Sequence, residues 1–104
     1  MIRKASRMKV LPGHCAEFKK RLDELWPEMG AMLKDHGARD YSIFLDEQTG
    51  SLFAYVVIES EEKWGAAART EVCQRWWAYM KDIMETNEDN SPKSWALEEV
   101  FYLE

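Results

Sequence analysis

The sequence predicts one domain of the α+β class over residues 1–104, in which an antiparallel sheet carries helices on one of its faces. Three observations predict this fold. Residues 2–10 alternate in character as a strand does, and residues 41–59 form two β-rich runs joined by a polar turn. Two further stretches, 15–33 and 72–84, repeat their apolar residues at helical spacing. A length of 104 residues is the usual size of one domain.

The first strand and the first helix are separated by the break Pro12-Gly13. Ile2–Val10 alternates and has one strongly charged face, which is typical of a strand near the edge or end of a sheet. Helical periodicity starts at about His14. Its apolar positions are Cys15, Phe18, Leu22, Leu25, Trp26, Met29 and Leu33. Because Pro27 cannot donate a backbone hydrogen bond, we expect this helix to kink or restart near Trp26.

A hairpin and a short helix come next. Tyr41–Asp46 and Leu52–Glu59 are β-rich runs, and the polar residues 47–51 join them. Ser60 is a favourable N-cap, and we expect a short helix over Glu61–Arg69.

The last third of the chain predicts a helix, a loop and a closing strand. Thr70 caps a helix over Glu71–Met84, with a carboxylate in its first turn. Residues 85–94 are polar and form a loop or a lid. Glu98–Leu103 is predicted as the final strand. The resulting order, βαββαβ, is the ferredoxin-like arrangement.

The predicted strands are apolar on both faces. Phe44 lies between Ile43 and Leu45, and Phe53 and Val57 alternate with Ala54 and Val56 along the next strand. Helices on one face of the sheet would leave the other face wet, so we expect a homodimer that buries sheet against sheet.

Composition excludes several classes of partner. The net charge of −5 and the absence of a basic tract argue against nucleic acid. No apolar run approaches the ~20 residues of a membrane span, and the N-terminus lacks the apolar core of a signal peptide. Cys15 and Cys73 are predicted to be reduced, buried thiols of a cytoplasmic protein. We find no spacing of His and Cys residues that indicates a metal site.

Trp76 and Trp77 are the strongest candidates for a binding role. Adjacent residues point about 100° apart around a helix, so one ring can lie in the core while the other faces a cavity. An indole face suits the apolar face of a sugar ring, and its N–H can donate to a hydroxyl. Periodicity alone favours a core position for both rings.

Six segments in order resemble the L-rhamnose mutarotase family from one end of the chain to the other. They are MIRKA at 1–5, LWPEM at 25–29, DYSIFLD at 40–46, VCQRWWAYMKDIM at 72–84, TNEDNSP at 86–92 and EEVFYLE at 98–104, with the Trp pair as the most distinctive. The resemblance implies a dimeric α/β barrel that interconverts the α and β anomers of L-rhamnose or a similar 6-deoxy sugar. Such a reaction requires a general acid and a general base but no cofactor or metal.

The resemblance also implies roles for single residues. Family members have a proton-donor histidine at the position of Leu22 and a tyrosine at that of Phe18, and neither replacement here can transfer a proton. Tyr41 matches a substrate-binding tyrosine, and Trp76 and Trp77 match the family's tryptophan pair.

Two residues of the matched loop, Asn87 and Asp89, are candidates for contact with sugar hydroxyls, although turn stabilisation explains them equally well. Tyr41 is the best remaining proton donor, but a phenol with a pKa of about 10 suits neutral pH poorly.

Three hypotheses follow. The first is a rhamnose-mutarotase-type isomerase whose activity is impaired because Leu22 replaces the histidine. The second is a sugar-binding homologue without catalysis. The third, which is based on architecture alone, is a dimeric α/β-barrel monooxygenase.

Overall fold

The computed structural model describes residues 1–104 and contains one four-stranded sheet. The strands are β1 (Ile2–Lys9), β2 (Arg39–Asp46), β3 (Ser51–Ile58) and β4 (Trp95–Leu97). Their spatial order is β2-β3-β1-β4, and every neighbouring pair is antiparallel. This order is that of a ferredoxin-like sheet, as the sequence predicts.

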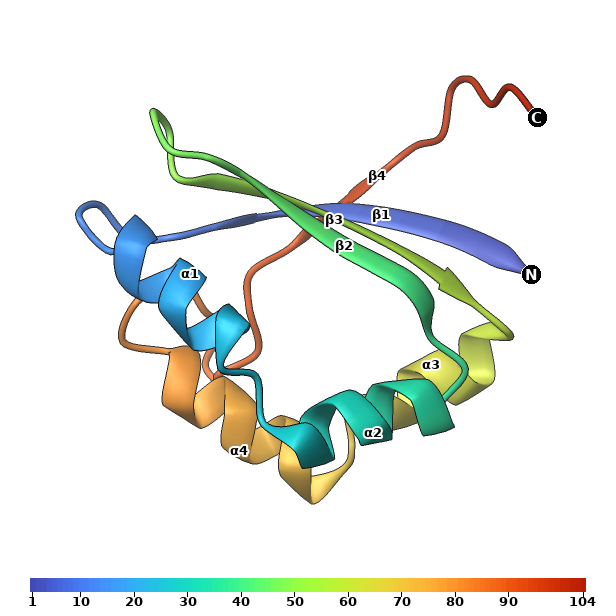
Figure 1. Ribbon diagram of the computed structural model, residues 1–104, viewed down its shortest axis with the longest axis horizontal. Coiled ribbons are helices and arrows are strands. Elements are labelled where there is room, and N and C mark those ends of the chain that lie inside the picture. The colour runs from blue at the N-terminus through green and yellow to red at the C-terminus, as the bar shows by residue number, and fades with distance from the viewer.

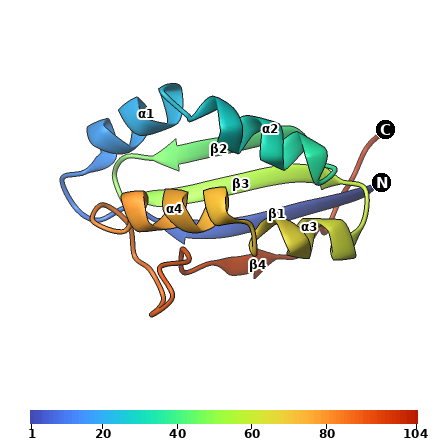
Figure 2. The same ribbon diagram turned by 90° about the horizontal axis from the view of Figure 1, so that it is seen from below.

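Four helices cover one face of this sheet and leave the other open (Figures 1 and 2). They are α1 (Cys15–Asp23), α2 (Pro27–Asp35), α3 (Glu61–Ala67) and α4 (Glu71–Met80). Seen from below, α1 and α2 form one row across the sheet, and α4 and α3 form a second row beside it (Figure 2). None of these helices is both long and apolar enough to cross a lipid bilayer.

The predicted restart near Trp26 is confirmed. Trp26 is extended, with ψ of 132°, and Pro27 occupies the first turn of α2, where its missing N–H costs no hydrogen bond. The break divides the predicted helix into α1 and α2. It lets their two apolar faces follow the curvature of the sheet.

The predicted caps are also present, but both capped helices end early. The hydroxyl of Ser60 accepts a hydrogen bond from the N–H of Lys63 at 3.1 Å, and that of Thr70 accepts one from Cys73 at 3.3 Å. α3 ends at Ala67 instead of Arg69, and α4 ends at Met80 instead of Met84. The end of α4 is a turn because Met84 pairs with Val10 in a β-bridge and is drawn away from the helix axis.

The predicted closing strand over Glu98–Leu103 is wrong. β4 lies earlier, at Trp95–Leu97, and residues 98–104 are exposed and without regular structure. The residues of this tail favour a strand by composition, but their pairing with β1 ends at Ala5 opposite Leu97. Side chains hold the tail instead. Arg3 contacts Glu99 through two hydrogen bonds of 2.8 Å.

Alternation along the strands separates an inner and an outer surface of the sheet. On the inner face, Leu52, Ala54, Val56 and Ile58 of β3 are buried beneath the helices. The outer face carries the exposed apolar side chains Phe44, Phe53, Trp95 and Leu97.

Three distant segments meet at one corner of the fold, where Val10, Gly50 and Met84 come together. The N–H of Val10 donates to the carbonyl of Gly50 at 2.8 Å, and Val10 also pairs with Met84. Gly50 has φ of +78°, and a Cβ there would lie 2.7 Å from the carbonyl oxygen of Val10. Only glycine fits this contact without strain.

Candidate functional site

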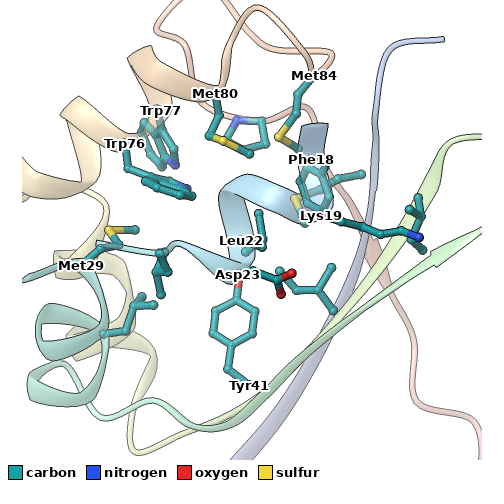
Figure 3. A pocket seen from close by; sticks show the side chains of 16 residues that line it. Phe18, Lys19, Leu22, Asp23, Met29, Tyr41, Trp76, Trp77, Met80 and Met84 are labelled. Carbon is teal, nitrogen blue, oxygen red and sulfur yellow. The ribbon is translucent and has the colours of Figure 1, made fainter. Parts of the chain in front are cut away.

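A cavity of about 510 Å³ lies between the helices and the inner face of the sheet (Figure 3). The residues that line it come from β1, α1, α2, β2, α4 and the segments between them. They are Met8, Phe18, Lys19, Leu22, Asp23, Leu25, Met29, Leu33, Tyr41, Ile43, Leu45, Trp76, Trp77, Met80, Met84 and Pro92. The size is within the range of small-molecule sites, which span roughly 300–1,000 Å³.

The wall formed by α1 is apolar. Phe18 and Leu22 are four residues apart, so they lie on the same face of the helix and both line the cavity. Phe18 is buried and Leu22 is half-buried. The structure thus places the two sequence-predicted positions side by side, and neither side chain offers a hydrogen bond to a ligand.

Arg21 anchors this wall to α4. Its guanidinium donates to the carboxylates of Glu17 and Asp82 and to the backbone carbonyl of Tyr79, at 2.7–2.9 Å for the shortest contact to each. This network fixes the backbone on which Leu22 stands.

Opposite α1, β2 contributes Tyr41 to the cavity. A bulge opposes Asp40 and Tyr41 to the single residue Val56 of β3, and Asp40 has φ of +50°. Tyr41 extends from the sheet with its hydroxyl pointing into the cavity (Figure 3), and its ring packs edge-on against Trp64 at a centroid distance of 6.0 Å.

Burial raises the pKa of the Tyr41 phenol, with a smaller contribution from Cys73. The residue as a whole is 40 % exposed, although its hydroxyl points into the cavity. The phenol is therefore neutral at pH 7. It can donate a hydrogen bond but is a weak acid.

The two tryptophans occupy different environments, although both line the cavity. Trp76 is 8 % exposed and belongs to the hydrophobic core, where its ring meets Trp26 edge-on at 5.0 Å. Trp77 is half-buried and packs against that core. Trp76 is thus the core member of the pair, and Trp77 is the ring with more freedom to contact a ligand.

Sequence reasoning missed two charged residues at the edge of the cavity, Lys19 and Asp23. Both are exposed, and they flank the Phe18–Leu22 stripe at a spacing of four residues. Lys19 forms an ion pair of 3.0 Å with Glu47, whereas Asp23 has no ion pair. Their position on α1, directly beside Phe18 and Leu22, is the sequence feature that could have identified them as cavity residues.

Asn87 and Asp89 bond within their own loop. The amide of Asn87 donates to the hydroxyl of Ser91 at 3.0 Å, and both the hydroxyl and the N–H of Ser91 donate to the carboxylate of Asp89. These bonds lower the pKa of Asp89. Of this loop only Pro92 lines the cavity, so the structure does not bring Asn87 or Asp89 together with the other candidates.

No group of three His, Cys, Asp or Glu side chains is arranged to hold a metal ion. The cysteine nearest the site, Cys73, is buried, and burial raises the pKa of its thiol to about 11. Cys73 is therefore a neutral apolar group beneath the cavity and not a nucleophile.

The sequence and the fold match known proteins along nearly the whole chain. The model of the L-rhamnose mutarotase family matches residues 3–103. The L-rhamnose mutarotase of Tolumonas auensis is 61% identical over 103 residues, which cover 99% of each chain. The crystal structure of an L-rhamnose mutarotase from Formosa agariphila superposes with a TM-score of 0.92 at 45% identity and covers 100% of both chains.

A more distant likeness concerns the fold alone. A protein of Nitrosomonas europaea described as a putative antibiotic biosynthesis monooxygenase has a TM-score of 0.65 at 12% identity, over 95% of this chain and 89% of its own. At that identity the shared architecture carries no information about the reaction.

The order of the strands, the helices on one face and the cavity beneath them define a ferredoxin-like α+β protein with a cavity between its helices and its sheet. Within that class, the chain belongs to the L-rhamnose mutarotase family, whose members are isomerases that act on sugar anomers.

Proposed function

We propose that this protein binds L-rhamnose or a similar 6-deoxy sugar in the cavity and interconverts its anomers more slowly than a relative with a histidine on α1. The observation that carries this proposal is the contrast between the cavity walls. Tyr41 and the tryptophan pair supply a hydroxyl and two indoles, whereas α1 supplies Phe18 and Leu22. Family membership supports the reaction class.

Mutarotation proceeds by opening of the sugar ring. The ring oxygen gains a proton while the anomeric hydroxyl loses one, and the open aldehyde rotates before the ring closes again. In this cavity the neutral Tyr41 hydroxyl is the group that can donate to the ring oxygen. The Asp23 carboxylate at the cavity edge is the group that can accept the anomeric proton.

The raised pKa of Tyr41 makes its proton harder to transfer than that of a group with a pKa near 7. General acid–base catalysis typically contributes ~10²–10⁴-fold, and a poorly matched acid forfeits much of that factor. Leu22 cannot supply a proton in place of Tyr41, because its side chain has no titratable group. We therefore expect binding without fast exchange.

The experiment is saturation-transfer NMR on equilibrated L-rhamnose, with and without protein, combined with a binding titration followed by indole fluorescence. We expect sugar-dependent fluorescence changes and an exchange rate only modestly above that in buffer. Fast exchange by the unmodified chain would contradict the proposal. Absence of any binding by folded protein would refute the sugar site itself.

A second candidate is a sugar-binding homologue without catalysis, which the apolar α1 wall favours. The same experiment separates the two. Binding with an exchange rate equal to that in buffer would establish the second candidate.

We further propose that two copies associate through their outer sheet faces. Phe44 is 64 % exposed there, and Phe53, Trp95 and Leu97 extend the same surface. Adjoining this surface, the tail over residues 98–104 presents further exposed apolar side chains. We also propose a cytoplasmic location and a single-domain organisation, since both cysteines are free thiols and one sheet carries all four helices.

A further inference from the structure

The cavity contains few groups that can bond to the oxygens of a sugar. Of its 16 lining residues, 13 are hydrophobic, Tyr41 among them, and the other three are Lys19, Asp23 and Pro92. Lys19 and Asp23 are exposed at the edge, and Lys19 is already paired with Glu47. The interior therefore offers the Tyr41 hydroxyl, with the indole N–H groups of Trp76 and Trp77 as further donors.

L-Rhamnose in its pyranose form has a ring oxygen and four hydroxyl groups, all of which are bonded to water when the sugar is free. Each hydroxyl that enters an apolar site without a partner weakens binding by about 5- to 150-fold. The donors of this interior are too few for every oxygen of the sugar. Asp23 at the edge, which the proposed mechanism assigns to the anomeric hydroxyl, is the one carboxylate in the lining, and no amide side chain is there to accept from the other hydroxyls.

The apolar surface is concentrated on two facing walls. Phe18 and Leu22 stand on α1, while Met80 and Met84 stand at and beyond the end of α4, and Figure 3 shows both pairs pointing into the cavity. Methionine side chains are flexible and polarizable, so they adapt to added methyl groups. A ligand with a methyl group in place of a hydroxyl proton would contact these walls without leaving that hydroxyl donor unpaired.

We propose that the cavity selects reducing 6-deoxy sugars that carry an O-methyl group over L-rhamnose itself. The inference rests on the proposed function, because it takes the cavity as a sugar site. Methylation removes one hydroxyl donor that has no acceptor in the interior and adds apolar surface that the Phe18–Leu22 wall can cover. The anomeric hydroxyl must remain free for ring opening.

The test compares dissociation constants for L-rhamnose and its 2-, 3- and 4-O-methyl ethers, measured by indole fluorescence and by calorimetry on the full chain. We expect at least one ether to bind about 5-fold or more tightly than L-rhamnose. If L-rhamnose binds as tightly as all three ethers or more tightly, the inference is wrong, while the proposed function stands. If none of the four sugars binds to folded protein, the proposed function fails as well.

A double variant makes the test specific for the α1 wall. Phe18→Tyr with Leu22→His adds a hydroxyl and an imidazole to that wall, and it should reduce or reverse the preference for the ether. Phe18→Leu with Leu22→Met keeps the wall apolar and should retain the preference. Equal preferences in the two double variants, both shown to be folded by circular dichroism, would overturn the inference. Cyclohexanol serves as a probe of non-specific apolar binding, and affinity equal to that of the best ether would likewise overturn it.

Discussion

The two faces of the sheet are built from alternate residues of the same strands, yet they present very different surfaces. On the inner face, Ile43 and Leu45 of β2 line the cavity beneath the helices. Phe44, which lies between them in the sequence, is exposed on the outer face. On the inner face Lys4 is paired with Glu61 of α3, while on the outer face Arg3 and Arg7 lie over the aromatic rings of Tyr102 and Trp95. The comparison predicts that the proposed ligand recognition and the proposed self-association depend on interleaved residues of the same strands and can be altered separately.

The largest expected effect is on catalysis at the inner face. Leu22→His should raise the rate of L-rhamnose anomer exchange by up to ~10²–10⁴-fold, because an imidazole has a pKa near the working pH. Saturation-transfer NMR measures the rate. Leu22→Asn is the matched control, since it is polar but does not titrate near pH 7. Equal rates for the two variants would show that proton transfer does not depend on this position.

A second effect distinguishes the two tryptophans of the inner side. Trp76→Ala should lower the free energy of unfolding by about 3–5 kcal/mol, because Trp76 is 8 % exposed and packs against Trp26. Trp77→Ala should cost less stability and weaken sugar binding more. Urea unfolding and fluorescence titration check the two quantities. Similar losses of stability in both variants would contradict the assignment of Trp76 as the core member.

At the outer face, Phe44→Lys should abolish the proposed self-association, because it places a charge on the exposed apolar surface. Sedimentation at micromolar concentration should give twice the 12.2 kDa chain mass for the unmodified protein and one chain mass for the variant. Ala31→Lys, at an exposed position of α2, adds the same charge on the helix side and should remain dimeric. A monomeric unmodified protein would refute self-association.

Alkaline pH should lower the free energy of unfolding through two groups on the helix side of the sheet, Tyr41 and Cys73. Burial raises the pKa of Tyr41, and it raises that of Cys73 from 9.0 to about 11, so both groups are favoured in their neutral forms when folded. Their contribution to stability is fully present below the ordinary pKa values and is lost as pH rises through the raised ones. The urea midpoint should fall between about pH 8 and pH 11. A variant with Tyr41→Phe and Cys73→Ala should show a smaller fall, and an equal fall would assign the effect to other groups.

The smallest expected effect is at the cavity edge. Asp23→Asn removes the proposed proton acceptor, and because water can partly replace it, we expect less than about a tenfold loss of residual exchange. Glu24→Gln, next to it on the chain but not lining the cavity, is the control. A rate unchanged by Asp23→Asn would exclude this carboxylate as the base.

The spacing of the apolar residues, the N-cap residues and Pro27 were enough to predict the order of the helices and strands and the restart of the helix at Pro27. They also predicted that helices cover one face of the sheet. The same signals failed to predict where an element ends when tertiary contacts determine that end. Val100, Phe101, Tyr102 and Leu103 favour a strand by composition, but pairing with β1 ends before them, at Ala5 opposite Leu97. Met84 fits the stripe of α4, yet its bridge to Val10 ends the helix earlier.

Of the candidate site, the sequence could predict the residues that the structure assembles around the cavity, namely Phe18, Leu22, Tyr41, Trp76 and Trp77. It could not predict that the side chains of Asn87 and Asp89 bond within their loop, since the same polar residues suit a turn and a sugar equally well. Lys19 and Asp23 were missed because their role depends on which side of α1 faces the opening.

The corner at which Val10, Gly50 and Met84 meet has a consequence for how the protein folds. Its contacts join segments separated by tens of residues, and the cavity lining likewise extends from Met8 to Pro92. Contacts between such distant segments form late, after most of the loop-closure entropy has been lost. The cavity should thus be incomplete in the transition state for folding, and a bound sugar should slow unfolding while leaving the folding rate unchanged.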